Sequence, residues 1–253
     1  MAPRLHNILD TFEIVRLIHR EGADVGRRDI DGTTALHASR SSAVARTLIE
    51  YGADVNAKSS RGMSPLHRTR SVGVAKVLVE RGASVNATDN FGNTPLHYSN
   101  DIGTVRLLLQ HGASVNHRNV KGETPIHMST YGSKVTALAE AGADVDAVDN
   151  TGKTLLMKKS RCFYGFRLLD HLLKLNPCIF LKDMDGKTAI DFTVDELVNR
   201  RLQVYWKDQN WRRRKTLLLL RARRNADYVA KDALVLLTMG LPHGVFRLVL
   251  AYL

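Results

Sequence analysis

Aromatic residues and cysteine are scarce in this 253-residue sequence. Phe, Trp and Tyr together make up 6% of the chain, although hydrophobic residues reach 44%. A core built from Leu, Val and Ala suits a stack of repeated helical units better than one large globular core. The two cysteines, Cys162 and Cys178, form neither a CxxC pair nor a zinc-binding spacing. The sequence therefore predicts reduced thiols in a cytoplasmic or nuclear protein rather than a disulfide framework.

Signatures of secretion and of common enzyme classes are also missing. The first residues, Met1 to Asp10, lack the apolar run of roughly 7 to 15 residues that a signal peptide requires. The sequence contains no G-x-x-x-x-G-K-S/T loop, no G-x-S-x-G elbow, no H-E-x-x-H motif and no kinase signature set. Carboxylates such as Asp24, Asp54 and Asp144 recur where turns and helix caps are expected. We therefore expect no enzyme, no cofactor and no metal site.

One sequence unit recurs along most of the chain. Its clearest copy, Phe91 to Asn116, combines a turn glycine, a helix N-cap, a first-turn proline and a helix-ending glycine. These four features stand at Gly92, Thr94, Pro95 and Gly112. Neither of the two helices that they delimit can bury its apolar face alone, so each unit needs neighbours.

Equivalent residues recur at steps of thirty. The turn glycines are Gly32, Gly62, Gly92, Gly122, Gly152 and, after a longer step, Gly186. The N-cap candidates are Thr34, Ser64, Thr94, Thr124, Thr154 and Thr188. The motif closes with His37, His67, His97 and His127, and the second helices end at Gly52, Gly82, Gly112 and Gly142.

This unit resembles the ankyrin repeat, whose T-P-L-H signature stands at Thr94 to His97 and in near-matching form at the other histidines. The resemblance covers roughly residues 3 to 202, as about six repeats and a partial seventh. It implies an all-α solenoid over residues 1–202, followed by a basic helical tail over residues 203–253. Because ankyrin repeats usually have about 33 residues, we expect a shortened first helix or a shortened loop between the helices.

The repeated histidines are expected to be structural. Neighbouring helical layers lie roughly 8 to 10 Å apart, whereas zinc holds its nitrogen ligands at about 2.0 to 2.1 Å. Histidines that follow one another along a stack therefore cannot share one ion. The ankyrin resemblance implies instead that each histidine hydrogen-bonds backbone at the turn between repeats.

Residues that vary between repeats are the candidates for binding a protein target on the expected concave face. Arginines and exposed aromatics on a rigid surface are typical of binding hot spots. The alternative is that some of these side chains are merely solvated. The candidates are Arg40, Arg68, Arg70, Tyr98, Asn100, Met128 and Tyr131 on the short helices, with Phe91 at a hairpin tip.

The chain becomes strongly basic after about residue 202. Residues 200–253 contain twelve Lys or Arg and three Asp, so they carry +9 of the formal net charge of +12. The segment Trp211 to Arg224 holds seven basic residues and no acidic one. It could serve nuclear import or nucleic-acid contact, form the solvated face of a helix, or dock a partner. The seven basic residues are Arg212, Arg213, Arg214, Lys215, Arg221, Arg223 and Arg224.

The end of the sequence resembles the opening helix of an F-box. The matching positions are Leu241, Pro242, Phe246, Val249, Leu250, Tyr252 and Leu253. Ankyrin repeats with such a tail resemble the poxvirus PRANC proteins, a resemblance that implies a host–virus interaction and binding to the Skp-type adaptor of a cullin ubiquitin ligase.

Ankyrin SOCS-box proteins are the second resemblance, through Thr216-Leu217 and Leu220-Arg221. This resemblance implies an elongin-type adaptor. The alternative to both is that the tail helices cap the open end of the stack, as a solenoid requires for solubility.

The apolar stretch Ala233 to Leu253 is long enough to span a membrane. Arg247, near its centre, would cost about 2.5 to 3.5 kcal/mol there, so we expect no membrane insertion. The sequence thus predicts a non-enzymatic interaction scaffold in the cytoplasm, the nucleus or both. It would recruit a target to a ubiquitin ligase. The alternative function is a nuclear or nucleic-acid-associated scaffold that uses residues 211–224.

Overall fold

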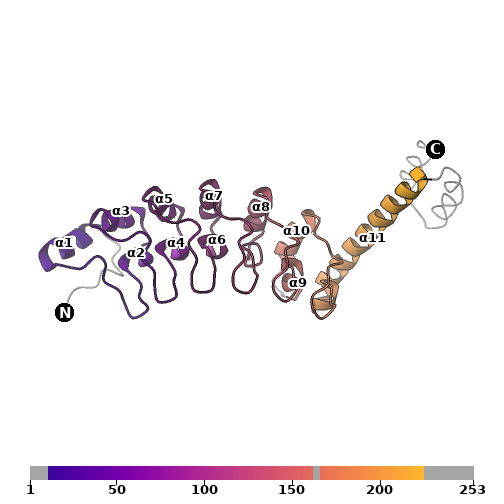
Figure 1. The fold of residues 1–253 in the computed structure, drawn as a ribbon, viewed down its shortest axis with the longest axis horizontal. Helices are drawn as coiled ribbons and strands as arrows, with labels where there is room; N and C mark the ends of the chain where they lie inside the picture. Colours follow the sequence, from indigo (N-terminus) through magenta and orange to yellow (C-terminus); the bar gives the residue numbers. More distant parts are fainter. Residues whose placement is uncertain (1–10, 162–165, 225–253) are drawn as a thin grey trace. The chain divides into compact units, whose positions relative to one another are not determined.

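The computed structural model describes residues 11–161 and 166–224, and every regular element within these residues is a helix (Figure 1). The predicted all-α fold is therefore confirmed for this part of the chain. The first helices are α1 (Thr11–Glu21), α2 (Ala35–Ala38), α3 (Ser42–Glu50), α4 (Pro65–Arg68), α5 (Val72–Glu80), α6 (Pro95–Tyr98) and α7 (Ile102–Gln110). They are followed by α8 (Gly132–Glu140), α9 (Leu155–Ser160), α10 (Phe166–Lys174), the 3-10 turn η1 (Ile190–Phe192) and α11 (Glu196–Arg224).

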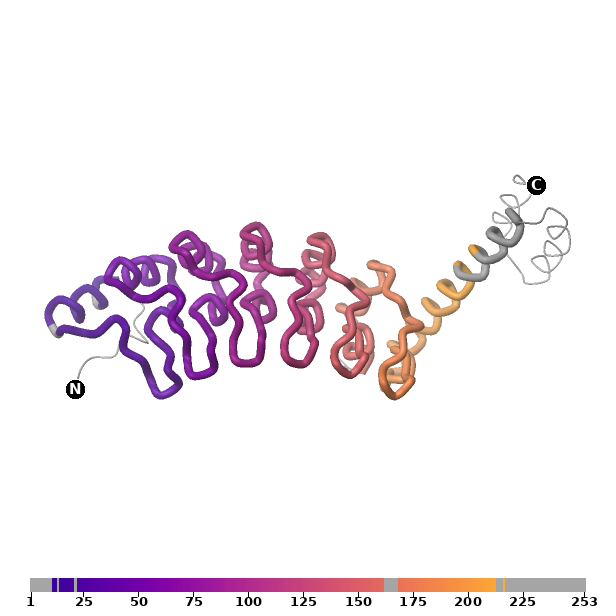
Figure 2. The backbone as a smooth tube through the Cα atoms, viewed as in Figure 1, coloured from indigo at the N-terminus to yellow at the C-terminus, as the bar shows by residue number. Residues whose placement is uncertain are grey.

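Each of the first three repeats pairs a very short helix with a longer one. Helices α2, α4 and α6 have four residues each, and helices α3, α5 and α7 have nine. In the fourth repeat, residues 125–128 form a turn in place of the first helix. The thirty-residue repeat thus has the shortened first helix that the sequence predicts. The longer helices form one row, and the short helices and hairpin turns lie below them (Figures 1 and 2).

The predicted turn and stop glycines adopt left-handed backbone conformations. Gly92, in a hairpin turn, has φ of +76°, and Gly112, after α7, has φ of +78°. At Gly92 an added Cβ would also lie 3.2 Å from the backbone nitrogen of Val120 in the next hairpin. Any other residue would therefore strain the backbone and press against the neighbouring repeat.

Two columns of aliphatic side chains form the core. The residues of both columns are almost fully buried, so each repeat completes the core of the next. Truncating one such leucine to alanine in a packed core typically costs about 2 to 5 kcal/mol. The columns consist of Leu36, Leu66, Leu96 and Ile126 on the short-helix side and of Leu48, Leu78, Leu108 and Leu138 on the long helices.

Asparagine side chains link the repeats at the ends of the long helices. Asn86 Nδ2 donates to the carbonyl oxygen of Gly112 at 2.9 Å, and Asn86 Oδ1 accepts from the backbone nitrogen of Ser114 at 2.8 Å. Asn56 and Asn116 make the same pair of bonds to their following repeats. Each asparagine therefore satisfies one donor and one acceptor of the adjoining loop, which fixes the register of neighbouring repeats.

The chain divides into two compact units between Asn199 and Arg200, within helix α11. Helix α11 runs through residue 202, where the sequence places the start of the tail, and it includes the basic segment 211–224. The F-box-like segment 241–253 and the apolar stretch 233–253 lie outside the described residues. Within residues 11–161 and 166–224, no helix combines the length and apolar character of a membrane span.

Candidate functional site

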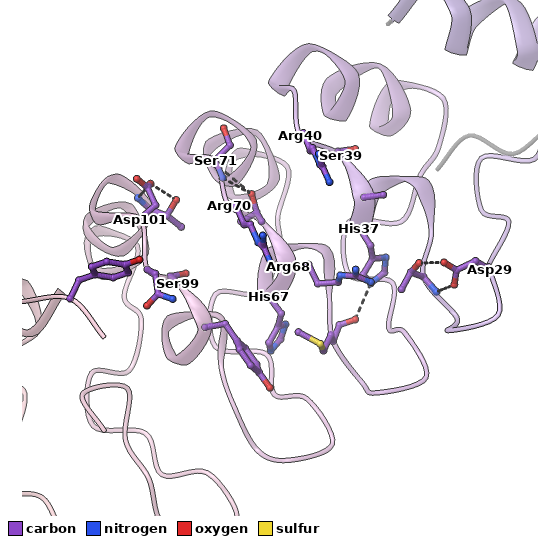
Figure 3. A pocket seen from close by; sticks show the side chains of 18 residues that line it. Asp29, His37, Ser39, Arg40, His67, Arg68, Arg70, Ser71, Ser99 and Asp101 are labelled. Carbon is purple, nitrogen blue, oxygen red and sulfur yellow. Dashed lines mark hydrogen bonds between the residues drawn. The ribbon is translucent and has the colours of Figure 1, made fainter. Parts of the chain in front are cut away.

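A groove of about 1180 Å³ crosses the first four repeats on the side of the short helices (Figure 3). Its lining comes from the end of each short helix and from the residues that lead into the following long helix. Six of the eight predicted target-binding residues line this groove. They are Arg40, Arg68, Arg70, Tyr98, Asn100 and Tyr131.

The other two predicted residues lie elsewhere. Phe91 stands at a hairpin tip and is 53% exposed. Met128 ends the turn that replaces the first helix of the fourth repeat, and its side chain is half-buried. Neither residue lines the groove. Met128 is the repeat equivalent of Tyr98, which does line the groove.

The repeat register decides which side chains meet in the groove. Arg40, Arg70 and Asn100 occupy one repeat position, two residues after the short helices. Arg68 and Tyr98 occupy another, the last residue of α4 and α6. Equivalent residues of successive repeats lie side by side in a stack. The variable side chains at these two repeat positions therefore form one continuous surface.

The arginines give one end of the groove a positive charge. Arg40, Arg68 and Arg70 are exposed, and none of them forms a hydrogen bond or ion pair with the residues that the structure describes. Two described carboxylates line the groove, and both accept hydrogen bonds from residues near them in sequence. Asp29 Oδ2 accepts from Thr33 Oγ1 at 2.5 Å, and Asp101 Oδ2 accepts from the backbone nitrogen of Thr104 in the first turn of α7. The guanidinium groups therefore remain available for a ligand.

Tyr98 is held in the groove by a buried polar network. Its Oη donates to Asp89 Oδ2 at 2.7 Å and accepts from Asn93 Nδ2 at 2.9 Å. Burial and the bond to Asp89 raise the pKa of Tyr98 to about 12. Asn93 Oδ1 in turn accepts from Asn119 Nδ2 at 2.8 Å, which extends the network into the fourth repeat. Tyr98 thus presents a fixed ring, because its hydroxyl is already used within the stack.

The network continues to an ion pair in the fifth repeat. Asn119 Nδ2 donates to Glu123 Oε2 at 3.1 Å, and Lys158 Nζ lies 2.6 Å from Glu123 Oε1. The same Nζ lies 2.7 Å from Asp149 Oδ2. These two carboxylates raise the pKa of Lys158 against the lowering effect of burial, so its ammonium charge is retained. The polar side chains of this network are therefore hydrogen-bonded or ion-paired to one another within the repeat stack.

The repeated histidines have the structural role that the ankyrin resemblance implies. His97 Nδ1 accepts from the backbone nitrogen of Thr94 at 3.0 Å, so the proton lies on Nε2, which donates to the carbonyl oxygen of Glu123 at 3.2 Å. His37, His67 and His127 make equivalent bonds to the next hairpin. Burial lowers the pKa of His97 to about 4 and lowers that of the other three. Each imidazole is thus neutral at pH 7, with both ring nitrogens hydrogen-bonded.

Sequence reasoning missed one unusual residue close to the groove. Lys134 in α8 is completely buried, and its Nζ donates to the carbonyl oxygen of His97 at 2.9 Å. Burial lowers the pKa of Lys134 to about 7. The position is occupied by Val74 and Thr104 in the two preceding repeats. A lysine in a column of small, largely apolar residues was therefore the sequence signal for it.

Only the beginning of the basic segment is described at side-chain level. Arg212 is exposed, and its Nε lies 2.9 Å from Asp208 Oδ2 one helical turn earlier. Such exposed pairs contribute little, typically about 0.3 to 0.5 kcal/mol. The side chains of the other six basic residues of the segment, and all the adaptor-binding residues expected between Leu241 and Leu253, lie outside the described part.

The family comparison agrees with this architecture. A model described as "Ankyrin repeats (3 copies)" matches residues 6–89, 39–119 and 69–149. These overlapping matches cover more than half of the sequence, and the chain therefore belongs to the ankyrin-repeat family. Ankyrin repeats serve as protein–protein interaction scaffolds, which is the class of function that this fold indicates. No curated protein matches the sequence.

Solved structures show the same fold. The ankyrin repeat domain of Bcl-3, a member of the IkappaB protein family, is 24% identical, with a TM-score of 0.58 over 76% of this chain and 91% of its own. The ankyrin repeat domain of human ASB11 is 22% identical, with a TM-score of 0.69 over 80% of this chain and 97% of its own. The resemblance of the tail to F-box and SOCS-box segments stays a prediction.

Proposed function

We propose that this chain is an adaptor that holds a protein target in the groove of its first four repeats and tethers it through the C-terminal tail to a cullin-type ubiquitin ligase. The groove carries the first half of the proposal. It gathers arginines that pair with none of the described residues, together with exposed aromatic surface, on a rigid scaffold, while motif residues such as Thr94 and His97 are hydrogen-bonded within the stack.

The tail carries the second half of the proposal, from sequence alone. The F-box-like residues Leu250 and Tyr252 would contact a Skp-type adaptor, and the SOCS-box resemblance would place an elongin-type adaptor on the same tail. Target and adaptor then occupy different segments of the chain. Each contact can therefore be removed without removing the other.

Affinity capture from a cell extract tests both halves. The baits are the full chain, a groove variant that combines Arg70→Ala with Tyr131→Ala, and a chain that ends at Met239. We expect the groove variant to lose the target while it keeps cullin components, and the shorter chain to show the reverse. Arg46→Ala, an exposed substitution in α3 outside the groove, is the matched control and should retain both.

Two results would contradict the adaptor role. Equal recovery of cullin components by the chain ending at Met239 would remove residues 240–253, and with them the F-box-like segment, from the proposal. Unchanged recovery of a Skp-type adaptor by the double variant Leu250→Ala and Tyr252→Ala would remove the F-box resemblance specifically. A target that is captured equally well by the groove variant would refute the first half.

A nuclear or nucleic-acid-associated scaffold is the second candidate function. The observation that favours it is the position of the basic segment Trp211–Arg224 within one uninterrupted helix, α11. A helix that neutralises several phosphates binds nucleic acid with a strong dependence on salt. Recovery of nucleic acid by the full chain at low salt, with loss at moderate salt, would support this candidate over the adaptor.

A further inference from the structure

We infer that the groove binds an extended acidic segment of its protein partner, with carboxylates at Arg40 and Arg70 and an apolar side chain toward Tyr98 and Tyr131. This inference rests on the proposed function and specifies the chemistry of the target. The groove has a basic end, built by the first two repeats, and an end with exposed aromatic surface, built by the third and fourth repeats, whose lining also includes the Asp101 carboxylate.

The basic end fits carboxylates in particular. Arg40, Arg68 and Arg70 converge on the groove from two successive repeats (Figure 3). A guanidinium group presents a planar fork of donors that pairs with a carboxylate through two parallel hydrogen bonds. Since no described carboxylate pairs with these arginines, an acidic partner would supply the missing charge without displacing an internal contact.

The third repeat shows how a carboxylate is accommodated at this level of the stack. Asp101 Oδ2 accepts from both the backbone nitrogen and Oγ1 of Thr104, each at 2.8 Å, at the start of α7. In the second repeat the same position is Ser71, whose side chain makes no capping bond to the described residues of α5. Arg70 stands directly before it. A partner carboxylate at Arg70 would therefore take the place that Asp101 fills one repeat later, close to the positive end of a nine-residue helix.

The repeat spacing sets the spacing of the acidic residues. Helical layers lie roughly 8 to 10 Å apart, and an extended chain advances about 3.3 Å per residue. One repeat thus corresponds to about three residues of partner. Arg40 and Arg70 would select two acidic residues about three positions apart, and the aromatic end would select an apolar residue roughly three to six positions further on.

A protein segment fits this surface better than a nucleic acid does. The basic stretch spans two repeats and is bounded by Asp29 at one end and Asp101 at the other. A phosphate backbone repeats its charge along its whole length and would meet these carboxylates. Tyr98 and Tyr131 at the aromatic end offer contact surface for an apolar side chain instead.

Selection from a library of random 12-residue peptides tests the inference even while the natural partner is unidentified. The full chain is the bait, and enriched peptides are then synthesised and titrated by fluorescence anisotropy. We expect enriched peptides to carry an acidic pair about three residues apart. We expect the double variant Arg40→Glu and Arg70→Glu to weaken their binding at least roughly tenfold, and higher salt to weaken binding to the unmodified chain.

The matched control is the double variant Arg46→Glu and Arg106→Glu. It makes the same charge change at exposed positions of α3 and α7 outside the groove, and it should change affinity by no more than about twofold. Circular dichroism and the thermal midpoint of each variant establish that the fold is retained. Weakening of binding to the same extent by both double variants would overturn the inference, because a general charge effect would then suffice.

The remaining outcomes separate this inference from the proposed function. If enriched peptides are neutral and depend on Tyr131 but not on Arg40 or Arg70, the acidic segment is refuted and the groove stands as a target site. If no enriched peptide depends on any groove residue, both proposals fail. If a single-stranded oligonucleotide competes for the same arginines with higher affinity than the peptides, the protein assignment is overturned.

Discussion

Replacing Lys134 with methionine should stabilise the protein at neutral pH. The side chain is completely buried, and among the described residues its amino group donates one hydrogen bond, to the carbonyl oxygen of His97. Burial lowers the pKa from the ordinary value of 10.5 to about 7, because the charged form loses its hydration. Methionine has a similar length and carries no charge, so Lys134→Met removes the desolvation cost while it keeps most of the packing.

The magnitude and its sign follow from the linkage between protonation and folding. Because the folded-state pKa lies below the unfolded value, the unfolded chain binds more protons between about pH 7 and pH 10.5, and stability rises with pH in that window. At pH 7 the burial of Lys134 destabilises the folded chain by about 4 kcal/mol. Lys134→Met removes this cost but also loses a hydrogen bond worth about 1 kcal/mol, so the net gain in stability is about 3 kcal/mol. Between about pH 7.5 and 9.5 this residue alone adds about 2.5 kcal/mol of stability.

Urea unfolding of both chains at several pH values is the assay. The difference between the two free energies of unfolding isolates Lys134, because every other titrating group is shared. We expect Lys134→Met to be more stable by a few kcal/mol at pH 7 and the gap to narrow as the pH rises toward about 10. Parallel stability curves for the two chains, or a less stable variant at pH 7, would refute the reasoning.

Three further substitutions test the stacking contacts. Gly132→Ala would press its Cβ into the imidazole ring of His171, so we expect a lower thermal midpoint that a second substitution, His171→Ala, restores. Asn86→Ala removes one donor and one acceptor between repeats and should lower the free energy of unfolding in urea by about 2 kcal/mol. For His97, the folded pKa of about 4 lies below the ordinary 6.5, so stability is full above pH 6.5 and is lost as the pH falls toward 4. When the pH falls from 6.5 to 4, the free energy of unfolding of His97→Gln should therefore decrease by about 2.5 kcal/mol less than that of the unmodified chain, as measured by urea unfolding.

The repeat architecture could be predicted because its signals are local. A turn glycine, an N-cap and a stop glycine act within a few residues of themselves, as Gly92, Thr94 and Gly112 do. Their recurrence then specifies the stack, since each unit has an apolar face that only a neighbour can cover. The thirty-residue period also predicted a shortening between these signals, in the first helix or in the loop after it, and the structure shows the four-residue first helices.

The groove could be predicted only in part. The thirty-residue spacing of Arg40, Arg70 and Asn100 alone predicts that these residues lie side by side, and all three line the groove. Lys134 could not be foreseen as a buried hydrogen-bond donor, because its partner carbonyl belongs to the previous repeat and is reached across the core. Nor does the repeat register show that the Tyr98 hydroxyl is engaged by Asp89, a contact that depends on how the hairpin folds back toward the short helix.

One set of residues holds the repeats together, and we expect another set to bind the target. The most direct test measures the affinity of one groove-selected peptide for two variants, one from each set. Tyr131→Ala changes a side chain that is 58% exposed in the groove, and Asn86→Ala changes a contact between repeats. At temperatures where all chains are folded, we predict a higher dissociation constant for Tyr131→Ala with an unchanged thermal midpoint. For Asn86→Ala we predict a lower midpoint with an unchanged dissociation constant. The opposite pattern, in which Asn86→Ala weakens binding and Tyr131→Ala does not, would contradict this division.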